Sequence, residues 1–395
     1  METPVVGVIG AGQLARMMQP AAIALGVPLR LLAEAEGMSA AQVIADTTVG
    51  DYTDFPTVRA WADGCTVVTF DHEHVPTASL EKLAADGIAT RPGPGALVHA
   101  QDKSVMRRRL ASLEVPQPRW SVVASPEAVA AFAAEGSGYP VVLKTTRGGY
   151  DGKGVWTVRS EDEAAEVLRA APEGIDLLAE EFVDFRRELS ALVARSPMGQ
   201  VAAYPVVESV QRDGICVEVT APAPDLDPDL AVHAQELAMT IVAELDVTGI
   251  LAVELFDTRD GQVLVNELAM RPHNTGHWSI DGAVTSQFEN HLRAVLDLPL
   301  GSPAPRAPWS VMVNILGGAA PATPDLYDGY PHVQARDPRV RVHLYGKALK
   351  PGRKVGHVTA YGDDLDDVRE RARHAAGWFD GTLGNDGTVF DEEST

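Results

Sequence analysis

Two glutamates, Glu254 and Glu267, have the spacing to act as a pair. They lie on two apolar, strand-like runs, 251–257 and 262–270, on either side of Asp260-Gly261. An Asp-Gly dipeptide between alternating apolar residues is a strong signal for a β-hairpin. If this dipeptide forms a two-residue turn, Glu254 lies directly opposite Glu267. The sequence therefore predicts two carboxylates that face each other across a hairpin.

Such a pair favours a bound divalent cation. Opposed side chains have Cβ atoms roughly 5 Å apart. At an effective dielectric constant of about 20, two carboxylates at that separation repel each other by roughly 3 kcal/mol. Ligation by oxygens alone suits magnesium, which completes its shell with waters and substrate phosphates. The alternative is a solvated hairpin whose two acids turn into water.

The residues after the second strand strengthen the metal interpretation. Arg271, His273 and His277 follow it at once. Arginine binds anions through two parallel hydrogen bonds, and histidine titrates near neutral pH. We therefore expect an anion to be held beside the metal, with a group nearby that can carry a proton.

A second group of residues suits phosphate and nucleotide. The strand 141–144 leads into a loop, 145–154, that contains four glycines and two cations. Glycine lets backbone amides approach phosphate oxygens, while Lys144, Arg147 and Lys153 supply positive charge. A flexible surface hairpin is the alternative. Further on, the apolar run 177–183 carries two acids, which could present backbone groups to an adenine and a carboxylate to a ribose.

The start of the chain offers a competing interpretation. A strand over 5–9 leads into Gly10-Ala11-Gly12-Gln13-Leu14-Ala15, a helix follows to about Leu25, and a second strand, 27–32, precedes Glu34. This G-x-G-x-x-A pattern is typical of dinucleotide-binding turns, in which an acid after the second strand binds ribose. It favours a nicotinamide-binding oxidoreductase or a non-catalytic nucleotide sensor. Glycines also serve any tight turn that brings amides near a ligand.

A third strand, 65–70, ends at Asp71-His72-Glu73-His74. Ligands of open α/β sheets bind at the carboxyl edge of the strands. The two histidines have no third metal ligand at a suitable spacing. We therefore expect them to support the structure or contact substrate.

The composition limits the remaining possibilities. The chain has 395 residues, enough for two or three domains, and a formal net charge of −22, which disfavours nucleic-acid partners. Its two cysteines, Cys65 and Cys216, form neither a disulfide framework nor a metal cluster, so both are expected in the core. No apolar run is long enough to span a membrane, and the N-terminal residues lack the basic start of a signal peptide. We expect a cytoplasmic protein without membrane partners.

Taken together, the motifs resemble those of the ATP-grasp enzymes and, within them, the 5-(carboxyamino)imidazole ribonucleotide synthetases of purine biosynthesis. The resemblance runs nearly from end to end. It rests on GAGQLARM, TFDHEHVP, RGGYDGKG, EEFVDFRRELS, YPVVESVQRDGI, AVELFDTRDGQVLVNELAMRPHNTGHW, QFENHLRAVLDLPLG and YGKALKPGRKVGH. It implies an α/β (α+β) fold in three domains: a Rossmann-like N-terminal domain (1–98), an ATP-grasp body (99–300) and a small β-rich C-terminal domain (301–395).

The resemblance also implies site residues, by position. The ATP site would comprise Lys103, Lys144, Gly148, Gly149, Tyr150, Asp151, Gly152, Lys153, Gly154, Glu180, Glu181, Phe182, Val183, Glu188, Gln211, Asn266 and Glu267. Glu254 and Glu267 would ligate magnesium. The ribonucleotide pocket would comprise Gln13, Leu14, Glu73, Tyr150, Asp151, Arg271, Asn274, Lys347, Arg353 and Lys354. The catalytic residues would be Arg271, His273, Lys153 and Glu267, with Arg271 holding bicarbonate and His273 handling a proton.

Some positions depart from the family pattern or fit it poorly. Ala11 replaces a usual glycine, Met270 a usual proline, and Gln211 stands where many members have a histidine that contacts ATP. By strict strand alternation, Asn266 would face away from Glu267, so both reach the nucleotide only if a bulge or twist intervenes.

The C-terminal part carries a local reversal of charge. Four prolines between 299 and 308 predict a stiff linker. The segment 343–354 then holds four cations and no acid, which favours an anion site in an otherwise acidic protein. Residues 363–378 have the pattern of an amphipathic helix.

The activity that the resemblance implies is an ADP-forming carboxylation. ATP would phosphorylate bicarbonate to carboxyphosphate, and the amine of 5-aminoimidazole ribonucleotide would capture the carbon. We expect a homodimer that uses ATP and magnesium. The nearer alternative is a formate-dependent glycinamide ribonucleotide transformylase, also an ATP-grasp enzyme; the nicotinamide-binding oxidoreductase is the farther one.

Overall fold

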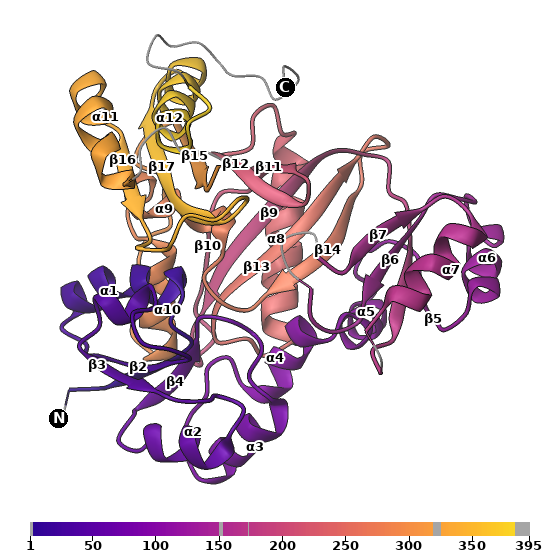
Figure 1. Ribbon diagram of the computed structural model, residues 1–395, viewed down its shortest axis with the longest axis horizontal. Helices are drawn as coiled ribbons and strands as arrows, with labels where there is room; N and C mark the ends of the chain where they lie inside the picture. Colours follow the sequence, from indigo (N-terminus) through magenta and orange to yellow (C-terminus); the bar gives the residue numbers. More distant parts are fainter. Residues whose placement is uncertain (1–2, 150–152, 173, 319–324, 384–395) are drawn as a thin grey trace.

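Three β-sheets organise the molecule (Figure 1). The computed structural model describes residues 3–149, 153–172, 174–318 and 325–383. The sheets are a parallel four-stranded sheet near the N-terminus, a small antiparallel four-stranded sheet and a nine-stranded antiparallel sheet between them. No helix among these residues is long and apolar enough to cross a membrane.

The N-terminal sheet has the order β3-β2-β1-β4, with all strands parallel. The inner strand β1 and the edge strand β4 are fully buried, as expected for apolar runs covered on both faces. The strands are β1 (Val6–Ile9), β2 (Leu29–Ala33), β3 (Asp46–Val49) and β4 (Val67–Phe70). The helices are α1 (Gln13–Leu25), α2 (Phe55–Trp61), α3 (Thr77–Ala85) and α4 (Pro94–Gln101). The strand–turn–helix order expected from the sequence is confirmed.

The small sheet, at the right of Figure 1, has the order β5-β8-β6-β7. Its apolar face packs against two helices through side chains such as Val129 and Ala164. The strands are β5 (Trp120–Val123), β6 (Val141–Thr145), β7 (Val155–Val158) and β8 (Leu177–Glu181), and the helices are α6 (Pro126–Ala134) and α7 (Glu161–Ala170). Helix α5 (Lys103–Ser112) precedes this sheet and connects it to the rest of the molecule.

The large sheet has the order β14-β13-β9-β11-β12-β15-β17-β16, with β10 paired to β9. Its strands are β9 (Phe185–Arg195), β10 (Val201–Ala203), β11 (Val207–Arg212), β12 (Ile215–Ala221), β13 (Gly249–Thr258), β14 (Val263–Ala269), β15 (Trp309–Leu316), β16 (Arg341–Leu344) and β17 (Lys354–Gly362). Helix α8 (Pro228–Glu244) packs apolar side chains against this sheet, whereas helix α10 (Gln287–Val295) contributes apolar side chains to the core of the N-terminal sheet. Because β15 pairs with β12, the sheet runs without a break from the middle of the chain into its C-terminal part.

The C-terminal part combines strands β15 to β17 with helices α11 (Tyr330–Arg336) and α12 (Leu365–Asp380). The predicted amphipathic helix is confirmed as α12. It begins after Asp364, whose side chain accepts a hydrogen bond from the Asp367 amide, as helix N-caps do. Its apolar side, including Val368 and Phe379, is buried against the sheet.

Candidate functional site

The hairpin of β13 and β14 pairs Glu254 with Glu267, so the predicted opposition of the two glutamates is confirmed. The predicted turn was wrong. The Thr258 amide donates to the Gln262 carbonyl at 2.9 Å, which leaves a three-residue loop, and Gly261 adopts φ +83°. Three-residue hairpin loops commonly end on such a left-handed residue.

A β-bulge restores the expected register. Glu254 pairs with Glu267, but Leu255 pairs with Val265, which leaves Asn266 as the extra residue of β14. The longer loop and the bulge each shift the register by one residue, and the two shifts cancel. The bulge also breaks strict alternation, so Asn266 and Glu267 both line the same cavity.

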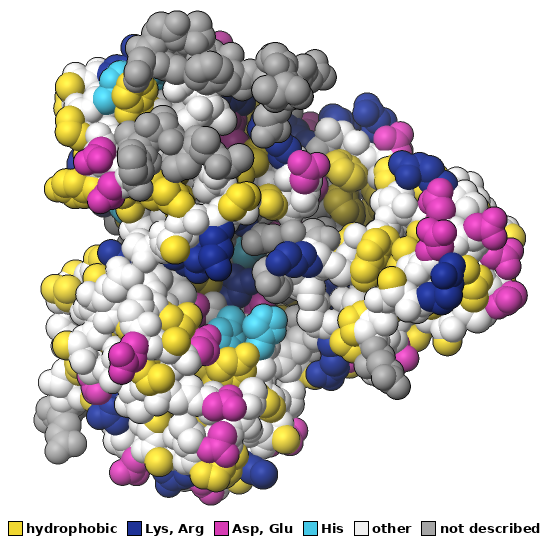
Figure 2. All heavy atoms as spheres, viewed as in Figure 1, with side chains coloured by type: hydrophobic (Ala, Val, Ile, Leu, Met, Phe, Trp, Pro, Cys, Tyr) yellow, Lys and Arg dark blue, Asp and Glu magenta, His cyan; other side chains and the backbone are white. Residues whose placement is uncertain are grey.

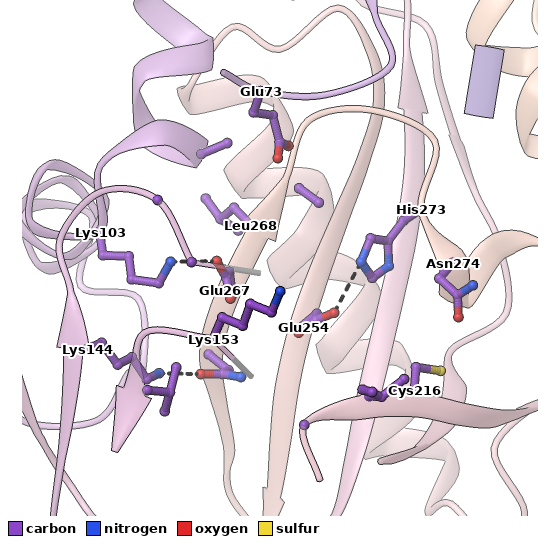
Figure 3. Close-up of a pocket in the computed structure, with 18 of the residues that line it drawn as sticks. Glu73, Lys103, Lys144, Lys153, Cys216, Glu254, Glu267, Leu268, His273 and Asn274 are labelled. Carbon is purple, nitrogen blue, oxygen red and sulfur yellow. Dashed lines mark hydrogen bonds and ion pairs between the residues drawn. The ribbon is translucent and has the colours of Figure 1, made fainter. Parts of the chain in front are cut away.

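Two lysines contact this bulged segment (Figure 3). Lys103 Nζ donates to Glu267 Oε1 at 2.8 Å, and Lys144 Nζ donates to Asn266 Oδ1 at 2.9 Å. Burial opposes the ionisation of Glu267, but the charge and hydrogen bond of Lys103 outweigh it and lower the pKa. Glu267 is therefore held as a carboxylate.

The negative charge of Glu254 is less well compensated by nearby positive charge than that of Glu267. Burial, together with the charges of Glu267 and Glu188, raises its pKa to about 8. Its Oε1 lies 3.2 Å from His273 Nε2, and burial keeps the pKa of that histidine well below its usual value. Glu254 and Glu188, whose pKa values are both raised, lack sufficient positive charge around them, which fits a site that takes up a cation.

The carboxylate oxygens of Glu254 and Glu267 suit magnesium, which takes only part of its ligands from the protein. Among the described residues, no three histidine, cysteine or acidic side chains converge as metal ligands. Two carboxylates on facing strands, Glu254 and Glu267, would therefore need waters or phosphates to complete a coordination shell, which is the usual arrangement for magnesium.

The glycine-rich loop has a tightly closed base. A side chain on Gly149 would meet the Lys153 carbonyl at 2.6 Å, and one on Gly154 would meet Thr145 Oγ1 at 2.7 Å. Glycine is therefore required where the two ends of the loop touch. Arg147 Nε lies 2.9 Å from Asp102 Oδ2, and Arg147 also lines the cavity. The predicted residues Tyr150, Asp151 and Gly152 lie outside the described residues.

The predicted nucleotide acids differ in availability. Glu180 is buried between Arg107 and Lys144, each at 2.7 Å, and Glu181 Oε1 accepts from the Arg119 amide. Their carboxylates are thus engaged by the protein. Burial raises the pKa of Glu188 to about 7, with the charge of Lys144 opposing the shift. Glu188 lines the cavity together with Glu180 and Glu181.

The N-terminal glycine turn is closed by the protein itself. Asp71 accepts hydrogen bonds from the amides of Gly12, at 2.8 Å, and Ala15, at 2.7 Å. Glu34, the expected ribose-binding acid, accepts from the Ala11 amide and pairs with His72. A side chain therefore occupies the place where a dinucleotide would put its pyrophosphate. This geometry disfavours the nicotinamide alternative.

The segment after β14 is fixed from both sides. Glu73 binds Arg271 at 3.3 Å and the Met270 amide at 2.7 Å. Asn274 exchanges two hydrogen bonds with Asn314, a buried residue of β15 that also donates to the Cys216 carbonyl. The N-terminal and C-terminal parts of the molecule thus both position the Arg271–Asn274 segment.

The basic C-terminal segment packs against the N-terminal turn. Lys347 hydrogen-bonds Gln13, Ser39 donates to the Tyr345 carbonyl and Gln42 to the Gly346 carbonyl. Figure 2 shows lysine and arginine side chains gathered around the hollow at the centre of the molecule, with histidines on its wall. Part of the positive charge thus gathers at this hollow despite the acidic composition.

These groups share one cavity of about 1330 Å³, lined by residues of the two antiparallel sheets and by helix and loop residues that follow the strands of the N-terminal sheet. The predicted site residues that line it are Gln13, Leu14, Glu73, Lys103, Lys144, Gly148, Gly149, Lys153, Glu180, Glu181, Phe182, Val183, Glu188, Gln211, Glu254, Asn266, Glu267, Arg271, His273, Asn274, Lys347, Arg353 and Lys354. Gly154 lies at the base of the loop instead. Cys216 is buried and also lines the cavity, whereas Cys65 is only partly buried.

Sequence reasoning missed Asn314 and Arg107. Asn314 carries no local signal, since it is a polar residue on a mostly apolar, buried strand. Arg107 follows Lys103 by four residues, and this spacing places both on one face of α5. That spacing could have indicated that Arg107 lies on the same side of the helix as Lys103 and so close to the site.

Three family models match successive parts of the chain. They are the ribonucleotide synthetase preATP-grasp domain over 1–101, the ATP-grasp domain over 108–288 and the phosphoribosylaminoimidazole carboxylase C-terminal domain over 310–371. Together with the two sheets that enclose the cavity, these matches define an ATP-grasp ligase.

Similar proteins show to which family of ATP-grasp ligases the chain belongs. An N5-carboxyaminoimidazole ribonucleotide synthase of Mycobacterium bovis is 55% identical over 377 residues, covering 95% of this chain and 88% of the relative. A synthetase solved with ADP superposes with a TM-score of 0.87 at 35% identity, covering 96% of this chain and 98% of the other. The Aspergillus clavatus synthase solved with ADP and 5-aminoimidazole ribonucleotide has a TM-score of 0.86 at 34% identity, covering 94% and 97%. The chain belongs to the N5-carboxyaminoimidazole ribonucleotide synthase family.

Proposed function

We propose that the protein carboxylates the amine of 5-aminoimidazole ribonucleotide with ATP and bicarbonate, in purine biosynthesis. A bicarbonate oxygen attacks the γ-phosphorus of ATP, which gives carboxyphosphate and ADP. The amine then attacks the carboxyphosphate carbon, phosphate leaves, and the nitrogen loses a proton. Membership of the synthase family supports this assignment over the formate-using and nicotinamide alternatives.

One observation supports the proposal most directly. A single cavity joins the acid–lysine cluster around Glu267 to the basic segment that contains Arg353. The first suits nucleotide phosphates with a metal, and the second suits the phosphate of a ribonucleotide. Arg271 lines the same cavity and could hold an anion there for both substrates.

The residues act mainly by positioning and charge, as in other phosphoryl transfers. Lys103 and Lys144 are fixed by Glu267 and Glu180 and would face the phosphates, with Lys153 reaching from the glycine loop. Arg271, oriented by Glu73, would hold bicarbonate. His273 is the expected carrier of the amine proton. Closure of the glycine loop would keep water from the labile carboxyphosphate.

Magnesium is part of the proposal, with Glu254 and Glu267 as its ligands. The insufficient positive charge around Glu254 supports a cation there. When bound, the ion would neutralise charge on the phosphates. A homodimer and a cytoplasmic location are likewise proposed, and analytical ultracentrifugation and cell fractionation test them.

The decisive test compares two substrate mixtures. ADP release is measured with 5-aminoimidazole ribonucleotide plus bicarbonate, and separately with glycinamide ribonucleotide plus formate. Bicarbonate offers one more oxygen than formate, and a site built to bind that oxygen rejects the analogue lacking it, because buried polar groups are then left unpaired. We expect turnover only in the first mixture. Turnover only in the second would overturn the substrate assignment.

A further inference from the structure

A buried guanidinium, that of Arg107 on α5, lies behind the bulge of β14. The side chain has no exposed surface. Its Nη1 donates to the Val265 carbonyl at 2.7 Å and its Nη2 to the Asn266 carbonyl at 2.8 Å. A bulge disrupts the hydrogen-bond ladder around its extra residue. Arg107 supplies donors to the two carbonyls at that point.

The same guanidinium belongs to a closed ring of contacts around Asn266. Arg107 Nε donates to Glu180 Oε1 at 2.7 Å, and Glu180 Oε2 binds Lys144 at 2.7 Å. Lys144 in turn donates to the Asn266 side chain. Asn266 is thus held by its carbonyl through Arg107 and by its side chain through Lys144. This leaves the bulged residue little freedom to turn.

The ring also joins the two sheets that enclose the nucleotide end of the cavity. Lys144 and Glu180 belong to β6 and β8 of the small sheet, whereas Asn266 belongs to β14 of the large sheet. Lys103, one turn before Arg107 on α5, binds the carboxylate of Glu267. Helix α5 therefore fixes the side chain of Glu267 and the backbone of Asn266 together.

We propose that Arg107 is a positioning residue for the nucleotide and metal site. It keeps the bulge in the conformation in which Asn266 and Glu267 face the same side, although Arg107 itself lies behind the cavity wall. The inference rests on the proposed function, because it assumes that ATP with magnesium binds at these two residues. A buried ion pair is weak evidence for stability alone, so the role assigned to Arg107 is geometric.

The test is Arg107→Lys. Lysine keeps the positive charge, but its ammonium group cannot span the three acceptors that the planar guanidinium reaches. The matched control is Arg187→Lys. Arg187, on β9 of the same large sheet, likewise binds a buried carboxylate, Asp257, and a backbone carbonyl, that of Pro224, outside the nucleotide cavity. Both variants are measured by thermal unfolding and by calorimetric titration of ATP at several magnesium concentrations, without the second substrate.

We expect Arg107→Lys to weaken the binding of magnesium and ATP by roughly tenfold or more, the equivalent of one or two charge-assisted hydrogen bonds. Arg187→Lys should lower the melting temperature and leave that binding unchanged. Wild-type binding in folded Arg107→Lys would overturn the proposal.

A milder variant covers the case in which Arg107→Lys does not fold. Gln117→Leu removes the neighbour that lies 3.4 Å from Arg107 Nη1 and donates to the Arg107 carbonyl. It should weaken binding in the same direction by a smaller factor, and unchanged binding would again overturn the proposal. If the wild-type protein bound no ATP with magnesium, the proposed function would fail instead, so the two failures are distinguishable.

Discussion

At the scale of single residues, the two glutamates of the hairpin have different surroundings. Glu267 is paired with Lys103, which lowers its pKa, whereas burial and neighbouring acids raise the pKa of Glu254 to about 8. A cation between them would complete the neutralisation. The charges present in the protein compensate one carboxylate and leave the other dependent on a ligand.

The first prediction concerns Glu267→Gln. The variant loses the charge that Lys103 and the proposed metal share, so ADP release should fall roughly a thousandfold while the fold persists. A coupled ADP assay and circular dichroism measure the two properties. Glu218→Gln is the control, since Glu218 is likewise a carboxylate paired with cations, Arg369 and Arg373, but lies outside the cavity. Normal turnover of Glu267→Gln at ordinary magnesium would remove the pair from the mechanism.

The second prediction concerns Arg353→Ala. Arg353 is exposed, lines the cavity and belongs to the basic segment. Its loss should weaken binding of 5-aminoimidazole ribonucleotide by roughly tenfold and change ATP binding little, as measured by calorimetry. Arg341→Ala, an exposed arginine of the same part of the chain outside the cavity, should change neither. The opposite order of effects would reassign the basic segment.

At the scale of elements, the hairpin depends on two irregularities. Its loop has three residues and ends on Gly261, and its second strand carries a bulge at Asn266. Each alone would put Glu254 out of register with Glu267. The metal-ligand geometry is therefore a property of the whole hairpin and not of either strand.

The third prediction concerns Gly261→Ala. Gly261 has φ +83° and open space around it, so alanine meets no clash but must adopt the left-handed conformation. We expect a loss of about 1 kcal/mol in stability, measured by urea denaturation. Gly95→Ala is the control, because Gly95 also has open space but lies in helix α4 without a positive φ. That variant should be neutral or slightly stabilised, and an equal loss in both would exclude backbone strain as the cause.

At the scale of the molecule, a buried histidine joins two of the sheets. The Ile250 amide on β13 donates to His291 Nδ1 at 3.2 Å, so the ring proton is on Nε2, which lies 2.8 Å from Thr69 Oγ1 on β4. Burial lowers the pKa of His291 to about 3. Protonation would remove the acceptor that the Ile250 amide uses.

The fourth prediction follows from this pKa. Between pH 6.5 and 3 the unfolded chain binds a proton at His291 that the folded protein does not, so stability is lost as the pH falls through that range, by up to about 1.4 kcal/mol per pH unit. His291→Gln should therefore show a shallower decline of melting temperature between pH 7 and 5. His233→Gln, at an exposed position, should keep the wild-type slope. A slope unchanged in His291→Gln would contradict the assignment.

The sequence by itself determined those features that are written locally. Apolar periodicity predicted β1, α1, β4 and α12. The Asp-Gly signal predicted the β13–β14 hairpin, and motif order predicted the family. These predictions agree with the structure because turn chemistry and side-chain periodicity act over a few neighbouring residues.

Only the tertiary structure decided how these features meet. The bulge is held by long-range partners, among them Arg107, which is 158 residues from Val265. Asp71 binds the amide of Gly12, 59 residues earlier in the chain. Its carboxylate closes the N-terminal turn, and this contact disfavours dinucleotide binding there. Asn314 fixes Asn274 across 40 residues. Such contacts provide hydrogen-bond partners for backbone and side-chain groups that have none nearby in the sequence. The partners are determined by packing between the sheets, and a local sequence pattern does not contain that information.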